Sequence, residues 1–274
     1  MPDAVYTHGH QEPVLRSHRR RTAEDSAGYL LPRLRPGLSL LDVGCGPGTI
    51  TAGLARAVAP GPVTALDSAP GVLDDARAAC RAAGVDTVAF SVGDVTALDL
   101  PDGGAEDGAS GFDVVHAHQV LQHLGDPVGA LREMRRVCRP GGTVAARDAD
   151  YSAMTWWPRP PGLDVWLRVY RAVARANGGE PDAGRRLLRW ARSAGFAEVE
   201  PSASTWCFAT PADRAWWGGL WADRTLAPEY GAMAVAGGHA HREELAEAAE
   251  GWRQWAAAED GWFAVLHGEV LCRR

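Results

Sequence analysis

The sequence predicts an α/β fold in which helices cover both faces of a mainly parallel sheet. Short apolar stretches alternate with stretches of about a dozen residues that suit helices, and this alternation is typical of βαβ units. The predicted strands are short and apolar, as expected for a sheet buried on both faces. A glycine-rich turn at residues 44–48 joins the first predicted strand to the helix that follows it.

Composition sets the size of the core and excludes some chemistry. The chain has 274 residues, of which 46% are hydrophobic, so it can form one large α/β domain or a core with an added subdomain. All 28 basic residues are arginine, which excludes a lysine Schiff base and a phosphate-binding lysine. The net charge of −6 argues against a nucleic-acid partner.

The cysteines and the apolar stretches indicate the compartment. The five cysteines are odd in number, widely spaced and without a Cys-x-x-Cys pair, which suits free thiols in a reducing compartment. The first residues have no apolar signal core, and no apolar run approaches the length that spans a membrane. We therefore predict a cytoplasmic protein without a membrane partner.

The elements of the first half follow in order. A helix is predicted over about 12–34, and "RPG" closes it. Strands are predicted at 38–43, 62–67 and 87–94, where β-branched and apolar residues end at an Asp or at the glycine turn. Helices are predicted from Thr49 and over 70–83.

The second half continues the alternation and then changes in character. Strands are predicted at 111–118 and 143–150, with a helix over 126–138 that is closed by "RPGG". All 11 tryptophans lie at or beyond Trp156. Beyond Asp150 the sequence predicts helices over 164–177, 182–194, 211–224 and 242–258, and strands over 195–209 and 262–272.

The glycine turn and two aspartates predict a nucleoside site. Gly44, Gly46 and Gly48 lie between a strand and a helix, where backbone amides favour a negative group. Asp67 ends the second strand about twenty residues later, at the position of a ribose ligand, and Asp94 ends the third. The carboxyl ends of parallel strands form the usual ligand edge of an open α/β sheet. Loop capping is the structural alternative for both aspartates.

Five segments together resemble a known family. "LLDVGCGPGTIT", "ALDSAP", "SVGDVTALDLP", "FDVVHAHQVLQHLGDP" and "EMRRVCRPGGTV" are similar, in order and spacing, to class I S-adenosylmethionine-dependent methyltransferases, and most of all to the ubiquinone/menaquinone-biosynthesis-type branch that acts on small molecules. The resemblance covers about residues 38–148. It implies a Rossmann-like, doubly wound, seven-stranded sheet whose last strand is antiparallel.

The resemblance also implies the cofactor site. Gly44, Cys45 and Gly46 would contact the methionine part of S-adenosylmethionine, and the product would be S-adenosylhomocysteine. Asp67 would bind the ribose, with Ser68 beside it, and Asp94 and Val95 would contact the adenine. The segment 116–119, which includes the cofactor contact Ala117, would lie at the methyl-transfer site. Two alternatives stay open: an NAD(P)-dependent oxidoreductase, disfavoured by the Gly-x-Gly-x-Gly spacing, and a protein that binds the cofactor without catalysis.

Histidine is the side chain best suited as a base for a phenol-like acceptor. An unperturbed histidine pKa near 6.5 lies about 3.5 units below that of a phenol, against about 6 units for aspartate. His118 follows the fourth strand and is the first candidate, with His116 and Tyr6 as further catalytic candidates. A buried, hydrogen-bonded ring is the alternative role for His116. The His-x-His pairs have no third ligand with suitable spacing, so no metal is expected.

The remaining candidates concern the acceptor. The resemblance also implies that residues 1–35 form a lid, which would bring Arg21 to the cofactor and His10 to the acceptor. The methyltransferase domain is expected over 36–274, with a helical cap from insertions at about 151–180 and 209–260. Asp148, Asp150, Trp156 and Trp157 follow the fifth strand and are candidate acceptor contacts. Ordinary capping and core packing are the alternatives, and aromatic walls would suit a planar acceptor such as an indole, phenol or quinone.

Overall fold

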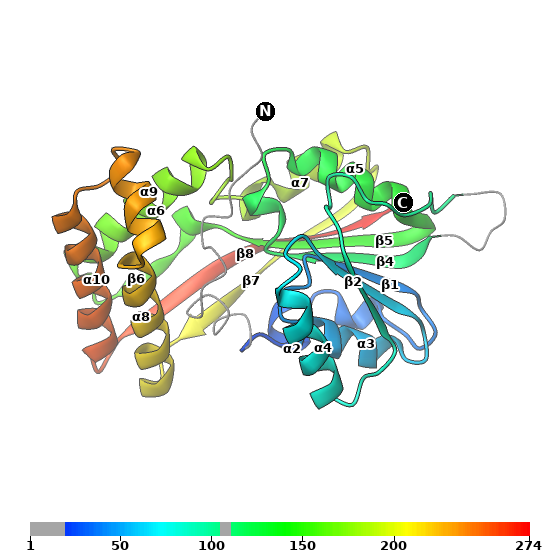
Figure 1. Ribbon diagram of the computed structural model, residues 1–274, viewed down its shortest axis with the longest axis horizontal. Coiled ribbons are helices and arrows are strands. Elements are labelled where there is room, and N and C mark those ends of the chain that lie inside the picture. Colours follow the sequence, from blue (N-terminus) through cyan, green and yellow to red (C-terminus); the bar gives the residue numbers. More distant parts are fainter. Residues whose placement is uncertain (1–19, 105–110) are drawn as a thin grey trace.

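A central sheet with helices on both faces organises the protein (Figure 1). The computed structural model describes residues 20–104 and 111–274. Five parallel strands lie in the order β3-β2-β1-β4-β5. The chain builds the sheet outward from β1 in one direction and then from β4 in the other, so a crevice forms between the ends of β1 and β4. Their bounds are β1 Leu40–Val43, β2 Val63–Asp67, β3 Val88–Val92, β4 Phe112–His118 and β5 Cys138–Ala149.

Strand β8 (Trp262–Arg273) extends the sheet in the opposite direction. It pairs antiparallel with β5 on one side and with β7 (Glu198–Phe208) on the other, so the expected antiparallel last strand is confirmed. The sheet has eight strands in the described residues, one more than expected, because the short β6 (Thr155–Trp157) pairs with the start of β8. Strand β6 pairs with the part of β8 that lies beyond the end of β5.

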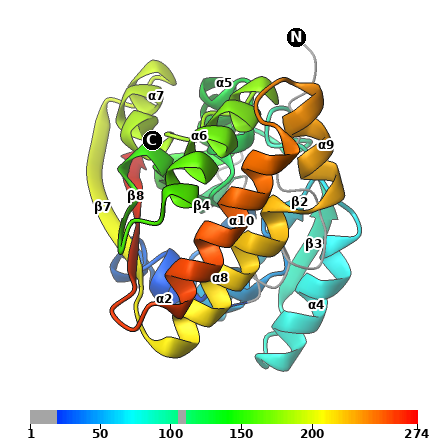
Figure 2. The same ribbon diagram turned by 90° about the vertical axis from the view of Figure 1, so that its left-hand side faces the viewer.

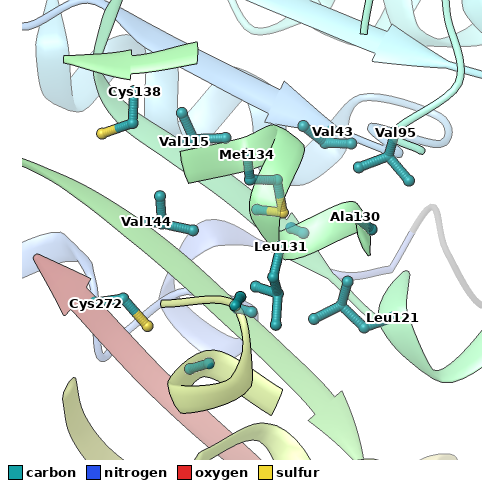
Figure 3. Close-up of a cluster of buried hydrophobic side chains, with 14 of the residues drawn as sticks. Val43, Val95, Val115, Leu121, Ala130, Leu131, Met134, Cys138, Val144 and Cys272 are labelled. Carbon is teal, nitrogen blue, oxygen red and sulfur yellow. The ribbon is translucent and has the colours of Figure 1, made fainter. Parts of the chain in front are cut away.

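Alternation of side chains along the strands divides the apolar residues between the two faces. Val115 and Val144 contribute to the cluster beneath α5 (Pro127–Val137) and α7 (Leu187–Ser193), where Leu131 and Met134 of α5 pack on them (Figure 3). Their neighbours along the strands, Val114 and Ala145, contribute to the opposite cluster beneath α2 (Ala23–Ser26) and α3 (Thr49–Val58). Helix α4 (Val72–Ala82) packs beside α3.

A separate group of helices lies at one end of the sheet, with α8 and α10 side by side and α9 next to them (Figure 2). It comprises α6 (Pro161–Ala176), α8 (Pro211–Thr225), α9 (Pro228–Ala236) and α10 (Arg242–Ala257). An aromatic core holds them to β6 and β8: the Trp166 ring lies 4.7 Å from both Trp221 and Trp252, and Phe263 stacks on Trp156 at 5.5 Å. The predicted helical cap segments contain these helices.

The long helix predicted over residues 12–34 is wrong in its described part. Helix α2 begins at Ala23, because Thr22 and Asp25 form a reciprocal capping box, and ends at Ser26. A 3₁₀ turn at Leu31–Arg33 follows, with Pro32 in its first positions. Further 3₁₀ turns span Leu121–His123, Tyr151–Ala153 and Gly184–Arg186.

Candidate functional site

A cavity of about 240 Å³ opens at the carboxyl ends of β1, β2 and β4. One part of its wall comes from the glycine turn and the residues that follow β2. Another part comes from the end of β4, from β7 and from helix α8. Its lining includes Arg21, Asp42, Gly44, Cys45, Gly46, Asp67, Ser68, His116, His118, Gln119, Val120, His123, Ala149, Tyr151, Trp206, Trp217, Trp221 and Arg224.

The glycine turn has a backbone that only glycine adopts without strain. Gly44, Gly46 and Gly48 have φ angles of 65°, 52° and 76°. A Cβ on Gly44 would lie 2.5 Å from Cγ2 of Val120, so this turn packs directly against the segment that follows β4. A side chain at Gly44 would therefore clash with Val120 and displace either the turn or the segment after β4.

Asp67 is oriented by the backbone at the end of β2. Its Oδ2 accepts from the Gly46 N–H at 2.9 Å, and its Oδ1 accepts from the Ala69 N–H at 3.0 Å. A carboxylate oxygen has more than one lone pair, so both oxygens keep acceptor capacity on the cavity side. With Ser68 beside it, this carboxylate fits the ribose diol of the cofactor that the resemblance implies.

Asp42 and His116 form a buried pair beneath the turn. The His116 Nδ1–H donates to Asp42 Oδ1 at 2.8 Å, and the Thr51 hydroxyl donates to Asp42 Oδ2 at 2.6 Å. The Nε2 atom of His116 is buried and has no hydrogen-bond partner among the described residues. Strand register brings the pair together, because Asp42 of β1 lies opposite His116 of β4.

His118 presents a neutral ring to the cavity. Neither ring nitrogen has a hydrogen-bond partner within residues 20–104 and 111–274, although the side chain is buried. Burial first, then the charges of Arg147 and Arg21, hold the pKa of His118 well below its usual value. The ring therefore offers one N–H donor and one lone pair. The sequence predicts His118 as the base, and the structure places its side chain in the cavity wall.

A buried ion pair that the sequence analysis missed lies on the same sheet face. Arg147 Nε donates to Glu269 Oε1 at 3.2 Å, and the hydroxyl of Ser204 also donates to Glu269. The Arg147 guanidinium lies 4.9 Å from the Trp206 ring centroid. A signal was present, because Glu269 and His267 occupy alternate positions of an otherwise apolar strand and so share a face.

The aromatic part of the cavity wall also differs from the expectation. Trp206 of β7, Trp217 and Trp221 of α8, and Tyr151 after β5 line it. Trp156 is buried against Phe263, and Trp157 is 58% exposed and donates its indole N–H to Asp260, so neither expected ring lines the cavity. The tryptophans that line it lie in β7, which pairs with β8, and in α8, which packs on α10, so their positions depend on contacts between segments that are distant in the sequence.

Three predicted cofactor contacts do not line the cavity. Asp94 accepts from the backbone N–H and the hydroxyl of Thr96, both at 2.8 Å, which is the loop-capping alternative. Val95 and Ala117 are buried in the cluster beneath α5 and α7. The contacts of Asp94 and Val95 with an adenine, and of Ala117 with the cofactor, remain predictions.

Asp148, near the end of β5, and Asp150, directly after β5, do not line the cavity. Asp148 accepts from the Gln122 backbone N–H at 3.1 Å, and burial raises its pKa to about 8. Asp150 accepts from Arg185 Nη2 at 2.7 Å. Both match the capping and loop roles better than an acceptor contact.

The remaining candidates are split by the bounds of the described residues. Arg21 lines the cavity, and its guanidinium lies 5.2 Å from the Trp206 ring centroid. Tyr6 and His10 lie outside the described residues. Within residues 20–104 and 111–274, no group of three or more His, Cys, Asp or Glu side chains is placed to hold a metal ion. In the same residues, every helix is too short or too polar to cross a bilayer.

Comparisons with known proteins agree with the fold. A family model described as a methyltransferase domain matches residues 34–179. An uncharacterized methyltransferase of Schizosaccharomyces pombe is 33% identical over 98% of this chain and 96% of its own length, and a probable methyltransferase of Aspergillus luteorubrus is 30% identical over 97% and 96%. The crystal structure of a putative methyltransferase from Bacillus halodurans superposes with a TM-score of 0.56 at 20% identity, over 90% of this chain and 99% of that one.

Proposed function

The chain belongs to the class I S-adenosylmethionine-dependent methyltransferase family, and from that premise we propose that it methylates O, N or C of a small planar acceptor. One observation carries the proposal. A single cavity is lined by the glycine turn and Asp67 and also by His118 and three tryptophans. Assignment to the ubiquinone/menaquinone-type branch remains a prediction.

The glycine turn, Asp67 and Ser68 would hold the cofactor. Gly44 leaves its backbone bare, and Asp67 is already oriented by two amides, so neither has to reorganise to bind a nucleoside. When bound, S-adenosylmethionine supplies a methyl group on a cationic sulfur that leaves with the bonding electrons. The protein's task is then to hold the acceptor in line and to keep water out.

The acceptor side of the cavity is aromatic. Trp217 is buried in the wall and stacks on Phe208 at 4.2 Å, so its ring has one fixed orientation. Its indole N–H has no hydrogen-bond partner in the described part of the chain. Rigid aromatic faces beside a free N–H donor favour a flat acceptor that carries an oxygen or nitrogen atom.

His118 is the proposed contact for the acceptor's reacting group. Because its pKa is lowered below 6.5, the gap to a phenol exceeds about 3.5 units, or about 5 kcal/mol, and full proton transfer before methylation is costly. A neutral ring still accepts a hydrogen bond from a hydroxyl or amine at ordinary pH. We therefore expect His118 to orient the nucleophile and to take its proton as the new bond to carbon forms.

Calorimetry separates the cofactors. S-adenosylhomocysteine and NADH are titrated into the full chain, and we expect saturable binding of the first only. Binding of NADH with comparable affinity, or no binding of S-adenosylhomocysteine, contradicts the cofactor assignment.

Labelled methyl donor separates an enzyme from a binder. Phenols, indoles and hydroquinones are offered with S-adenosylmethionine that carries a labelled methyl, and label in the extracted product is counted. His118→Ala should lower turnover far more than it lowers affinity for S-adenosylhomocysteine. His239→Ala, which changes a histidine outside the cavity, serves as the control and should leave turnover unchanged. Label transfer to none of these acceptors, with intact cofactor binding, would favour a non-catalytic protein.

A further inference from the structure

A pair of side chains from distant segments meets at the cavity wall. Gln119 follows β4 directly and lines the cavity, and His267 lies fully buried in β8. The side-chain nitrogen of Gln119 lies 2.9 Å from Nε2 of His267. Stacked next to His267, at 6.2 Å between ring centroids, is His118.

The backbone of β8 fixes the tautomer of His267. Its Nδ1 lies 3.1 Å from the carbonyl oxygen of Val265, and a carbonyl only accepts, so Nδ1 carries a proton. Burial and the charges of Arg147 and Arg21 lower the pKa of His267 well below its usual value, which keeps the ring neutral. A neutral ring protonated at Nδ1 has only a lone pair at Nε2.

The tautomer in turn fixes the amide of Gln119. Since Nε2 of His267 can only accept, the group that faces it must be the NH₂ of Gln119. The amide oxygen then occupies the other branch of the planar group. No described residue donates a hydrogen bond to it, and the side chain is part of the cavity wall.

The backbone at Gln119 is strained. Its φ is 53°, the one positive value for a residue other than glycine in the described part of the chain. The Gln119 N–H donates to the Arg147 carbonyl at 2.7 Å, and the next residue, Val120, packs against Gly44. Strain of this kind persists where the surrounding structure fixes it, often at functional sites.

We propose that His267 is a positioning residue that turns the Gln119 amide oxygen toward the cavity, where it accepts a hydrogen bond from a protic acceptor. The inference rests on the proposed methyltransferase function and narrows the acceptor to a molecule with a hydroxyl or N–H group. A site built to bind such a group rejects analogues that lack it, because the amide oxygen is left unpaired when such an analogue displaces water from it.

Nitrogen NMR tests the orientation without any acceptor. The full chain is prepared with ¹⁵N-labelled histidine, and the His267 signals are assigned by their loss in His267→Gln. We expect a neutral ring with its proton on Nδ1 at pH 6 to 8. A proton on Nε2 instead would turn the amide oxygen of Gln119 toward His267 and would overturn the proposal.

Two variants of Gln119 sharpen this test. Gln119→Glu has no N–H, so the contact with His267 survives only if one proton is taken up between the two groups. Because a carboxyl group is more acidic than an imidazolium, we expect this proton on the ring, with both ring nitrogens protonated at pH 7. Gln119→Met removes the contact and should leave His267 neutral. If the two variants give the same His267 spectrum, Gln119 does not face Nε2 and the lock does not exist.

Kinetics tests the role in acceptor binding, with the best phenol or hydroquinone of the labelled-methyl panel as the probe. His267→Leu should lower kcat/KM for this acceptor about tenfold, the loss of one hydrogen bond, with unchanged affinity for S-adenosylhomocysteine. His267→Gln restores a donor and an acceptor and should remain within about threefold of the wild type. Equal losses in both variants would indicate a purely structural role. Failure of the cofactor titration would defeat the proposed function and would leave the NMR result standing.

Discussion

Replacement of Asp67 tests the cofactor site most directly. Its carboxylate accepts from the backbone N–H groups of Gly46 and Ala69 and lines the cavity. Under the proposed function it also accepts from the two ribose hydroxyls of the cofactor. Asp67→Ala removes the acceptor for both hydroxyls and also frees the turn that carries Gly46.

The expected loss follows from the number of hydrogen bonds. A hydrogen bond to a charged group contributes about 1.5–3 kcal/mol, and water in the open cavity replaces part of each one. A net loss of about 3 kcal/mol for the two hydroxyls weakens binding of S-adenosylhomocysteine by roughly 100-fold. Asp67→Asn keeps one acceptor oxygen but sets an NH₂ group against a backbone N–H, so we expect a loss of roughly tenfold.

Isothermal titration with S-adenosylhomocysteine measures both variants at a temperature where thermal unfolding shows each to be folded. Asp74→Asn is the matched control, because this carboxylate lies in the first turn of α4, is 90% exposed and is not part of the cavity wall. Undiminished binding by Asp67→Ala would refute the assignment of the ribose site. An equal loss in Asp74→Asn would show that the effect comes from net charge.

Three further predictions concern stability. Gly44→Ala should lower the free energy of unfolding by about 1–3 kcal/mol, because φ is 65° and the new Cβ would clash with Val120. Gly219→Ala, inside α8 with open space around it, should raise the free energy of unfolding by about 0.4–1 kcal/mol. Urea unfolding measures both variants. Asp42→Ala leaves two buried donors unpaired and should cost about 2–5 kcal/mol in the same assay, where a cost below 1 kcal/mol would contradict the geometry. Because the pKa of Asp148 is raised to about 8, the native state holds a proton that the unfolded state loses near pH 4, and stability falls as pH rises between these values, by at most about 1.4 kcal/mol per unit. Asp148→Asn cannot lose that proton, so its stability relative to the wild type should increase from pH 5.5 to pH 8, and a constant difference would show that Asp148 stays ionised.

Local signals made the glycine turn and Asp67, which line the cavity, predictable. The positive φ angles of Gly44, Gly46 and Gly48 are a property of glycine itself, and Asp67 ends a strand whose apolar residues mark it in the sequence. These features need only the order of strand, turn and helix. The same kind of signal misled at the N-terminus, where the capping box at Thr22 starts a helix of four residues.

The acceptor half was not predictable because its residues meet through long-range strand register. His118 lies opposite Arg147 in β4 and β5, and Arg147 lies opposite Glu269 in β8. Trp206 reaches the same face only because β7 pairs with the other edge of β8. A shift of one residue in β8 would move its polar side chains to the face beneath α5 and α7.

The charge balance of this face fits the chemistry proposed for the cavity. Arg147 is buried, and Glu269 offsets its charge at 3.2 Å. Both His118 and His267 are held neutral by burial and by that arginine. A cavity that takes a sulfonium would bind it less well beside further cations, since like charges repel strongly where water is excluded. Low histidine pKa values therefore serve the cofactor as well as the acceptor: they leave lone pairs in the wall and add no positive charge to it.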